Sequence, residues 1–332
     1  MLLLACFALL QAAGPLTVPA AVAVVPTPPK PTLGDPLPAA GAARAEWEIF
    51  PSRRAVIPLG RQVINVPILM YHYIRWMPLY PDVMGYKLSV TPADFQEQLD
   101  WLAANGYHAI DFSDLRAYFA GREPLPIKPV VITLDDGYRD LYTTAYPMLH
   151  AHHFKAVAYI VSSFVGRSGY ATADQVLEMD RGGIEIASHT VDHPNLARAP
   201  WGYAMYELTE AKAWLERLVG HPVLDFAYPS GRFTSQVISA VQQAGYDTAV
   251  TEQSSTLHSL GNRYSWARVR VGGGEGLTDF VQGLGPVEPS VVITEPGDQF
   301  DADAPSLPRT FQLLPPTSGG ANTSGGLAKP RS

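Results

Sequence analysis

Short apolar runs alternate with longer amphipathic segments between residues 62 and 284 of the chain. The clearest run, residues 130–134, is rich in β-branched side chains and uninterrupted, which is typical of a strand buried on both faces. Thr91 and Pro92 open a helical segment, because Thr is a preferred N-cap and Pro suits the first helical position. The same reasoning predicts strands over residues 63–70, 107–110, 130–134, 156–161, 183–187, 224–228, 248–250 and 268–271. It predicts helices over residues 91–105, 112–121, 140–153, 173–179, 200–219, 235–244 and 277–284.

The regular alternation of strands and helices determines the expected fold class. Without hairpin signals between the strands, this pattern predicts an α/β fold with a parallel sheet and helices outside it. An open sheet and a closed barrel give the same pattern, so both remain possible at this point. Pro147 is expected to kink the helix over residues 140–153.

The two ends of the chain differ from the middle, where the apolar content suffices for a core. Residues 1–14 form an apolar segment followed by small residues, which resembles a secretory signal. Residues 15–61 are rich in Pro and Ala, as in an extended linker, and residues 286–332 have the composition of a disordered tail. We therefore expect a globular domain over residues 62–285 in an exported protein of the periplasm, cell envelope or extracellular space.

The first segment leaves alternatives open. It could be cleaved, act as a lipoprotein signal or other anchor, or be a hydrophobic cap on a soluble protein, and any membrane association is expected only through it.

The composition of the chain restricts its possible partners. The formal net charge is -7, from 24 Lys and Arg against 31 Asp and Glu, and no basic patch stands out, which argues against nucleic acid as the main partner. Cys6 is the only cysteine of these 332 residues.

Candidate chemistry begins directly after the strand over residues 130–134. Two adjacent carboxylates, Asp135 and Asp136, are followed by the turn residue Gly137. Parallel sheets carry their functional groups where strands end, and a metal ion would neutralise two carboxylates at such a place. A solvated turn after a strand is the simpler alternative, since Asp and Gly are common turn residues.

A pair of histidines, His189 and His193, follows the strand over residues 183–187. If the segment forms a helical turn, the spacing of four places both imidazoles on one side, as one metal ion requires. A parallel sheet would bring the pair to the same edge as Asp135 and Asp136. Two His and one carboxylate leave coordination positions open for water, which is typical of catalytic sites. The second aspartate could then take a proton from water. The alternative is a surface turn that carries two histidines.

Three segments together resemble a known family. Thr133-Leu134-Asp135-Asp136-Gly137, His189-Thr190-Val191-Asp192-His193 and Tyr228-Pro229-Ser230-Gly231 are similar, in this order, to the first three motifs of the polysaccharide deacetylases. This family is also called the nodulation-factor deacetylase homology group or carbohydrate esterase family four. The similarity covers residues 64 to 284. It implies a distorted (β/α) barrel, a divalent metal (usually zinc, sometimes cobalt or nickel), and removal of N-acetyl groups from a GlcNAc-containing polysaccharide of the envelope or matrix.

The resemblance also implies roles for individual residues. Asp135 would be the catalytic base, and the metal would be bound by Asp136, His189 and His193. The third motif would form a wall of the substrate groove, with the backbone N–H of Ser230 facing the oxyanion; its residues are Tyr228, Pro229, Ser230 and Gly231.

The sequence departs from the family pattern in three places. The family's third motif has an aromatic residue after its Pro, where this chain has Ser230. It also has Arg two residues before the Pro, where this chain has Ala227, so we expect Arg268 to support the base instead. The family's late Leu-x-His, which supplies the catalytic acid, is absent. In branches that act on poly-N-acetylglucosamine of biofilms, a similar His comes early, and this assigns the acid role to His72, with His258 as a second candidate.

Two other classes of function remain as alternatives. The altered third motif fits a non-catalytic polysaccharide-binding domain on the same fold. An aspartate at a strand end would also suit a magnesium-dependent phosphatase, which would not need His189 or His193. Peptidoglycan, chitin-like oligomers and exopolysaccharide all remain possible as the polymer.

Overall fold

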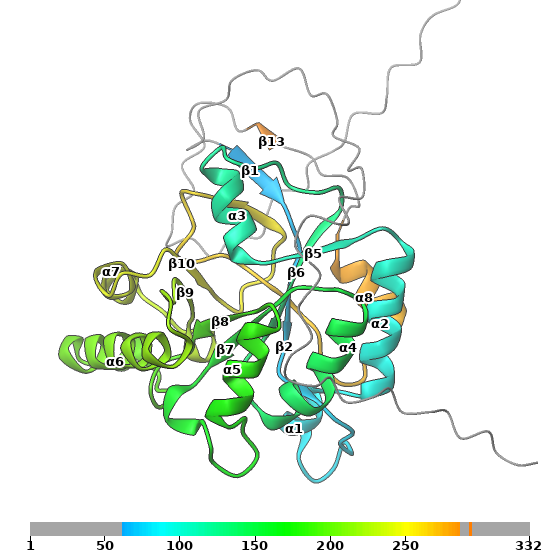
Figure 1. The fold of residues 1–332 in the computed structure, drawn as a ribbon, viewed down its shortest axis with the longest axis horizontal. Helices are drawn as coiled ribbons and strands as arrows, with labels where there is room; N and C mark the ends of the chain where they lie inside the picture. Colours follow the sequence, from blue (N-terminus) through cyan, green and yellow to red (C-terminus); the bar gives the residue numbers. More distant parts are fainter. Residues whose placement is uncertain (1–61, 286–291, 294–332) are drawn as a thin grey trace, which may run out of the picture. The chain divides into compact units, whose positions relative to one another are not determined.

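The computed structural model describes residues 62–285 and 292–293, and the expectations for residues 1–61 and for most of residues 286–332 lie outside this part. Eight parallel strands form its main sheet, in the order β10-β9-β8-β7-β6-β2-β12, with β5 paired to β6. These strands are β2 (Ile68–Tyr71), β5 (His108–Ile110), β6 (Pro129–Leu134), β7 (Ala156–Ile160), β8 (Ile184–Ser188), β9 (Asp225–Ala227), β10 (Thr248–Val250) and β12 (Val269–Arg270). The sheet curls into a half-barrel with helices around it, which confirms the expected distorted (β/α) barrel (Figure 1).

The helices that pack on the sheet follow the predicted pattern. They are α2 (Pro92–Ala104), α3 (Phe112–Phe119), α4 (Tyr146–Ala151), α5 (Ala173–Arg181), α6 (Trp201–Val219), α7 (Ser235–Gln243) and α8 (Leu277–Gly283). The prediction for α2 is confirmed in detail, because the Thr91 hydroxyl accepts a hydrogen bond from the Asp94 N–H at 3.1 Å. Among the described residues, no helix combines the length and apolar character that crossing a membrane requires.

Both faces of the central strands are buried, in two separate apolar clusters. Along β6, Val130 and Ile132 belong to the cluster beneath the outer helices, whereas Val131 belongs to the cluster inside the curl. The inner cluster also contains Trp266, whose ring stacks on Phe112 of α3 with centroids 5.8 Å apart. Burial on both faces explains why the strands read as continuous apolar runs rather than alternating ones.

The prediction of a single strand over residues 63–70 is wrong. The segment forms two strands, β1 (Gln62–Asn65) and β2, which belong to different sheets. β1 pairs antiparallel with β11 (Leu257–Ser259) and β13 (Val292–Ile293). Pro67 lies between the two strands and has no N–H to donate, so a continuous ladder is interrupted there.

The helix predicted over residues 140–153 is also divided. A π-helical turn, Leu141–Ala145, precedes α4, and Pro147 lies in the first turn of α4. Proline cannot donate to the carbonyl four residues earlier, and its ring clashes with that carbonyl, so the wider turn accommodates it. Three shorter elements lie between β2 and α2: the strand β3 (Tyr73–Ile74), the helix α1 (Val83–Lys87) and the strand β4 (Ser89–Val90), which pairs with β3.

Candidate metal centre and active site

Three strands of the main sheet end at residues with functional side chains. β6 is followed by Asp135 and Asp136, β8 by His189, and β2 by His72. β6 lies between β2 and β7 in the sheet, and β7 lies between β6 and β8. Because all these strands are parallel, their carboxyl ends meet at one edge, and the four side chains come together there.

Asp136, His189 and His193 form a group that could hold a metal ion, with one ligand atom from each residue and all three atoms within 4.8 Å of one another. The Asp136 Oδ1 lies 3.5 Å from the Nε2 of His189 and 3.5 Å from the Nε2 of His193. Two imidazole nitrogens and one carboxylate oxygen are donors that suit zinc and neighbouring divalent metals.

The hydrogen bonding of His189 fits metal binding. Its Nδ1 lies 2.8 Å from the carbonyl oxygen of Ala227. A carbonyl only accepts, so Nδ1 carries the proton, and the lone pair of Nε2 is directed toward Asp136. Burial lowers the pKa of His189 to about 4, which keeps the ring neutral at physiological pH. The nitrogen is therefore available as a ligand.

The histidines converge for a reason other than the predicted one. The segment between them is not a helical turn, since Thr190 and His193 have positive φ angles of 72° and 57°. The chain forms a tight loop in which the His193 N–H donates to the Thr190 hydroxyl at 2.9 Å. The two rings lie 4.8 Å apart because of this loop, and the helical explanation of the spacing is wrong.

Asp135 is paired with Arg268, the residue immediately before β12. The Nη1 and Nη2 of Arg268 donate to the two carboxylate oxygens at 2.7 Å each, and both side chains are buried. Arg268 also donates to the carbonyl of Thr251 at 2.9 Å and to the hydroxyl of Thr133 at 3.0 Å. Burial raises the pKa of Asp135, but the charge of Arg268 and its hydrogen bonds outweigh burial and hold that pKa well below its usual value. Asp135 is therefore ionised at neutral pH.

The two candidates for the acid occupy different environments. His72 is buried beside the carboxylates, with its Nε2 3.9 Å from the Asp135 Oδ2. Burial lowers the pKa of His72, and the negative charge of Asp135 acts in the opposite direction. His258 lies on β11, fully buried, and its Nε2 is 2.9 Å from the carbonyl of Val66, in the connection between β1 and β2. Of the two histidines, only His72 lies beside Asp135.

The third motif lies in a 3₁₀ turn, Pro229–Gly231, after β9. The Tyr228 ring is fully buried, stacks on Phe233 and donates its hydroxyl to the Tyr264 carbonyl, so this side chain is not exposed to solvent. Pro229 is also buried, and only Ser230 is well exposed, in a left-handed conformation with φ 53°. A groove wall at this place therefore depends on Ser230 and the partly exposed Gly231.

Several residues near the site carried no recognisable sequence signal. The Tyr138 ring lies between the rings of Tyr73 and Tyr170, at centroid distances of 3.6 Å and 5.1 Å. Burial and the nearby negative charge of Asp136 raise the pKa of Tyr138. Only its position after Gly137 could have drawn attention to Tyr138, whereas the other two tyrosines come from separate segments. Glu207 on α6, which accepts hydrogen bonds from the loop between the two histidines, also carried no sequence signal.

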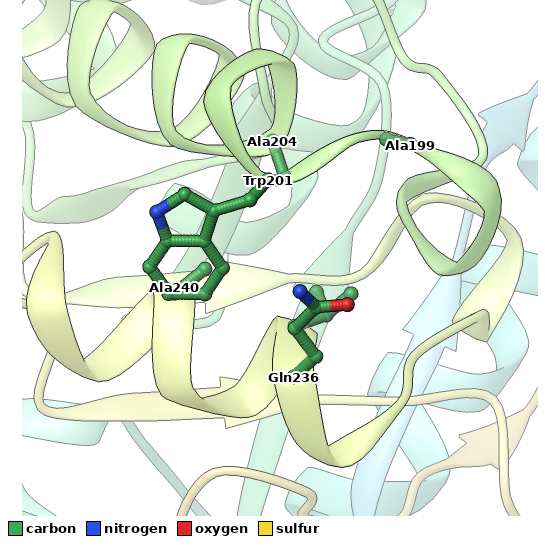
Figure 2. A pocket seen from close by; sticks show the side chains of 6 residues that line it. Ala199, Trp201, Ala204, Gln236 and Ala240 are labelled. Carbon is green, nitrogen blue, oxygen red and sulfur yellow. The ribbon is translucent and has the colours of Figure 1, made fainter.

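A small hollow elsewhere offers no alternative site. It lies between the start of α6 and α7, where the side chains of Trp201 and Gln236 are at its rim (Figure 2). It has no titratable side chain in its lining, which consists of Ala199, Trp201, Ala204, Gln236, Val237 and Ala240. The candidate chemistry therefore lies at the carboxyl edge of the sheet.

Several known proteins are similar to this chain in sequence and in fold. The family model described as polysaccharide deacetylase matches residues 122–249. The putative polysaccharide deacetylase YxkH of Bacillus subtilis (strain 168) is 30% identical over 210 residues, which are 63% of this chain and 72% of that protein. A poly-beta-1,6-N-acetyl-D-glucosamine N-deacetylase of Staphylococcus aureus (strain MRSA252) is 25% identical over 218 residues, 60% of this chain and 73% of that protein.

A solved structure agrees with the sequence relatives. The Streptococcus pyogenes deacetylase PplD, determined in complex with acetate, superimposes with a TM-score of 0.62 at 28% identity, covering 67% of this chain and 98% of that chain. The similarity to YxkH spans more than two thirds of that relative, and the fold agrees with that of a solved deacetylase structure. The chain therefore belongs to the polysaccharide deacetylase family.

Proposed function

We propose that residues 62–285 form a metal-dependent domain that removes N-acetyl groups from a GlcNAc-containing polysaccharide of the cell envelope or matrix. The observation that carries the proposal is the group of Asp136, His189 and His193, whose ligand atoms lie within 4.8 Å of one another beside an aspartate that Arg268 holds in place. The relative from Staphylococcus aureus, named as a poly-beta-1,6-N-acetyl-D-glucosamine N-deacetylase, supports the substrate class. Such polymers lie outside the cytoplasm, and the signal-like residues 1–14 are consistent with export.

In this proposal Asp136, His189 and His193 hold the metal, which we expect to be zinc, with cobalt or nickel as substitutes. A bound ion of this kind lowers the pKa of a water toward neutrality and polarises the acetyl carbonyl. Asp135 takes the proton from the attacking water. A carboxylate has about four acceptor positions and Arg268 uses two of them, so Asp135 keeps a free position on each oxygen while its orientation is held.

The third motif serves the oxyanion in the same proposal. β9 lies next to β8 in the sheet, so the turn after β9 comes to the edge that carries His189. There the backbone N–H of Ser230 would donate to the oxygen that becomes negative when water attacks the acetyl group. A backbone donor does not depend on the side chain, which explains why Ser in place of the family's aromatic residue is compatible with catalysis.

The acid role is assigned to His72, which has to deliver a proton to the leaving nitrogen. Because burial lowers its pKa, His72 is mostly neutral before the reaction begins. Asp135, 3.9 Å away, is placed to pass on the proton that it has taken from water. The proton thus moves from water to Asp135, then to His72, and finally to the nitrogen of the released amine.

His72→Ala is expected to lower kcat by about 10²- to 10⁴-fold, the usual contribution of a positioned proton donor. Zinc affinity should stay unchanged, because His72 is not in the group that could bind the metal. Steady-state rates of acetate release and metal titration measure the two effects. His258→Ala serves as the comparison and should leave kcat within a few-fold of the wild type. Near-normal turnover of His72→Ala would move the acid role to another residue.

The reaction itself is tested by acetate release from acetylated β-1,6- and β-1,4-linked glucosamine oligomers and from peptidoglycan. We expect release from at least one of them, its loss when a chelator removes the metal, and its return when zinc is added. A binding domain would release no acetate from any oligomer. A phosphatase would release phosphate from phosphoesters with magnesium and leave the acetyl groups in place. Either result would contradict the proposal.

A further inference from the structure

The loop between the two candidate metal-binding histidines is held by a carboxylate that belongs to none of the family motifs found in the sequence. The backbone N–H groups of Val191 and Asp192 both donate to the Glu207 Oε2, at 2.9 Å each. Glu207 lies on α6 and is fully buried. Two adjacent N–H groups that point at one oxygen form a small concave anion site, which this side chain fills.

The conformation of this loop requires support from outside. Thr190 and His193 both have positive φ angles, and for the β-branched Thr190 this is a sparsely populated region. Residues in such conformations persist only where their surroundings determine them strongly, and they concentrate at functional sites. The hydrogen bond from the His193 N–H to the Thr190 hydroxyl lies within the loop, so it cannot fix the loop relative to the sheet.

Glu207 connects the loop to α6. The loop is also joined to the segment after β7, because the Ser162 and Ser163 N–H groups donate to the carbonyls of Thr190 and Val191 at 3.1 Å and 3.0 Å, but only Glu207 holds the N–H groups of Val191 and Asp192. Within the part of the chain that the structure describes, Glu207 takes part in no ion pair, so its hydrogen bonds to the loop are the main compensation for its burial. Another contact at the loop, from the Ser163 hydroxyl to the Asp192 carboxylate at 2.6 Å, is exposed to solvent. A hydrogen bond in the low-dielectric interior is electrostatically stronger than one exposed to water, so the hydrogen bonds to Glu207 contribute more than this exposed one.

We propose that Glu207 is a positioning residue that holds the loop of residues 189–193 in its metal-binding shape before the ion arrives. Without this carboxylate, His193 would lose the backbone conformation that turns its Nε2 toward Asp136. His189 follows β8 directly and has its own anchor at the Ala227 carbonyl, so the effect falls mainly on His193. The inference rests on the metal site of the proposed function, but the shape of the loop can be measured without metal.

The experiment compares Glu207→Asp with Glu210→Asp in the full-length protein. Aspartate keeps the charge but is shorter by one methylene, so at position 207 it withdraws the acceptor from the loop. Glu210 lies on the same helix and is exposed, which makes the same change there a matched control. Two quantities are measured: the zinc affinity, by competition with a chromophoric chelator, and hydrogen exchange of the peptide covering residues 189–195 in the metal-free protein.

For Glu207→Asp we expect zinc to bind about 10- to 100-fold more weakly, the range found for lost partners of metal ligands. Exchange at Val191 and Asp192 should be faster, while strands β6 to β8 keep wild-type exchange. Glu210→Asp should match the wild type in both measurements. Wild-type affinity and loop exchange in Glu207→Asp would overturn the proposal, and so would a uniform rise of exchange over the whole domain.

A second variant keeps the inference testable if Glu207→Asp does not fold. Glu207→Gln leaves an acceptor oxygen at the same place but removes the charge that strengthens the hydrogen bonds. Zinc binding about two- to tenfold weaker with faster loop exchange supports the proposal, and unchanged values overturn it. If the wild-type protein binds no zinc, the proposed function fails, whereas the exchange of the loop still decides the role of Glu207.

Discussion

Asp135→Asn is expected to reduce the rate of acetate release by about 10²- to 10⁴-fold and to leave the metal bound, because the variant lacks only the group that takes the proton from water. Asp135 is not among the three residues whose ligand atoms come within 4.8 Å of one another. The amide oxygen of Asn can still accept from Arg268, so the neighbouring groups should keep their places. The rate is measured with the oligomer that the wild type deacetylates best, and the metal content by elemental analysis.

The adjacent residue provides the control for this experiment. Asp136→Asn makes the same chemical change one position later, but it weakens a proposed metal ligand, since a neutral amide binds divalent cations less well than a carboxylate. We therefore expect Asp136→Asn to lose metal and activity together, and Asp135→Asn to lose activity alone. If Asp135→Asn also came without metal, the roles of the two aspartates would have to be exchanged.

The second large effect is expected on stability. Arg268→Met removes the charge beside Asp135 and leaves the carboxylate buried without its partner, which typically costs about 3–5 kcal/mol. Denaturant unfolding of the metal-free protein measures the free energy of unfolding. In the double variant Asp135→Asn/Arg268→Met the loss should be smaller than the sum of the two single losses, because no unpaired charge remains.

A neighbouring ion pair shows what an exposed contact contributes. Arg270, two residues after Arg268, forms an ion pair with Glu252, and both side chains are partly exposed. Arg270→Met should therefore change the free energy of unfolding by less than about 1 kcal/mol. Equal effects of Arg268→Met and Arg270→Met would show that burial of the Asp135–Arg268 pair has no energetic consequence.

The pH dependence of stability gives a second measure of the same pair. In the wild type the folded-state pKa of Asp135 lies below its unfolded value, so this stabilisation is present at neutral pH and is lost as acid protonates the carboxylate. In Arg268→Met only burial acts strongly, and burial raises the pKa of Asp135 above its unfolded value. The stability of the variant relative to the wild type should therefore improve as the pH falls from 7.

Local signals in the sequence were sufficient for most of the fold. The uninterrupted run of residues 130–134 identified the central strand because a strand buried on both faces needs apolar side chains at every position. Thr91 and Pro92 identified the start of α2 because the cap satisfies backbone groups within a few residues. The position of Asp135, Asp136 and His189 at one edge of the sheet was predicted from the parallel arrangement of the strands alone.

Pro67 and the histidine spacing were interpreted with less success. Pro67 separates two strands although apolar patterning continues through it, whereas the helix over residues 140–153 is divided close to Pro147, where a kink was expected. Patterning reports which side chains are buried, whereas the missing N–H of proline decides where a backbone ladder can continue. The spacing of His189 and His193 was assigned to a helix, but it fits equally the loop that the structure contains.

By itself, then, the sequence determined the parallel α/β fold, the edge of the sheet that carries the chemistry, and the residues that could bind a metal, because these follow from short-range patterns and from motifs. Only the tertiary structure decided which distant groups complete the site. Arg268 was expected to support the base, but only the structure shows that its side chain reaches Asp135 across 133 positions of the chain. Only the structure also shows that Tyr228 is buried in the core and that Glu207 reaches the histidine loop from α6. Such contacts depend on how helices and strands pack, and no periodicity or local propensity encodes the distance between two side chains on different elements.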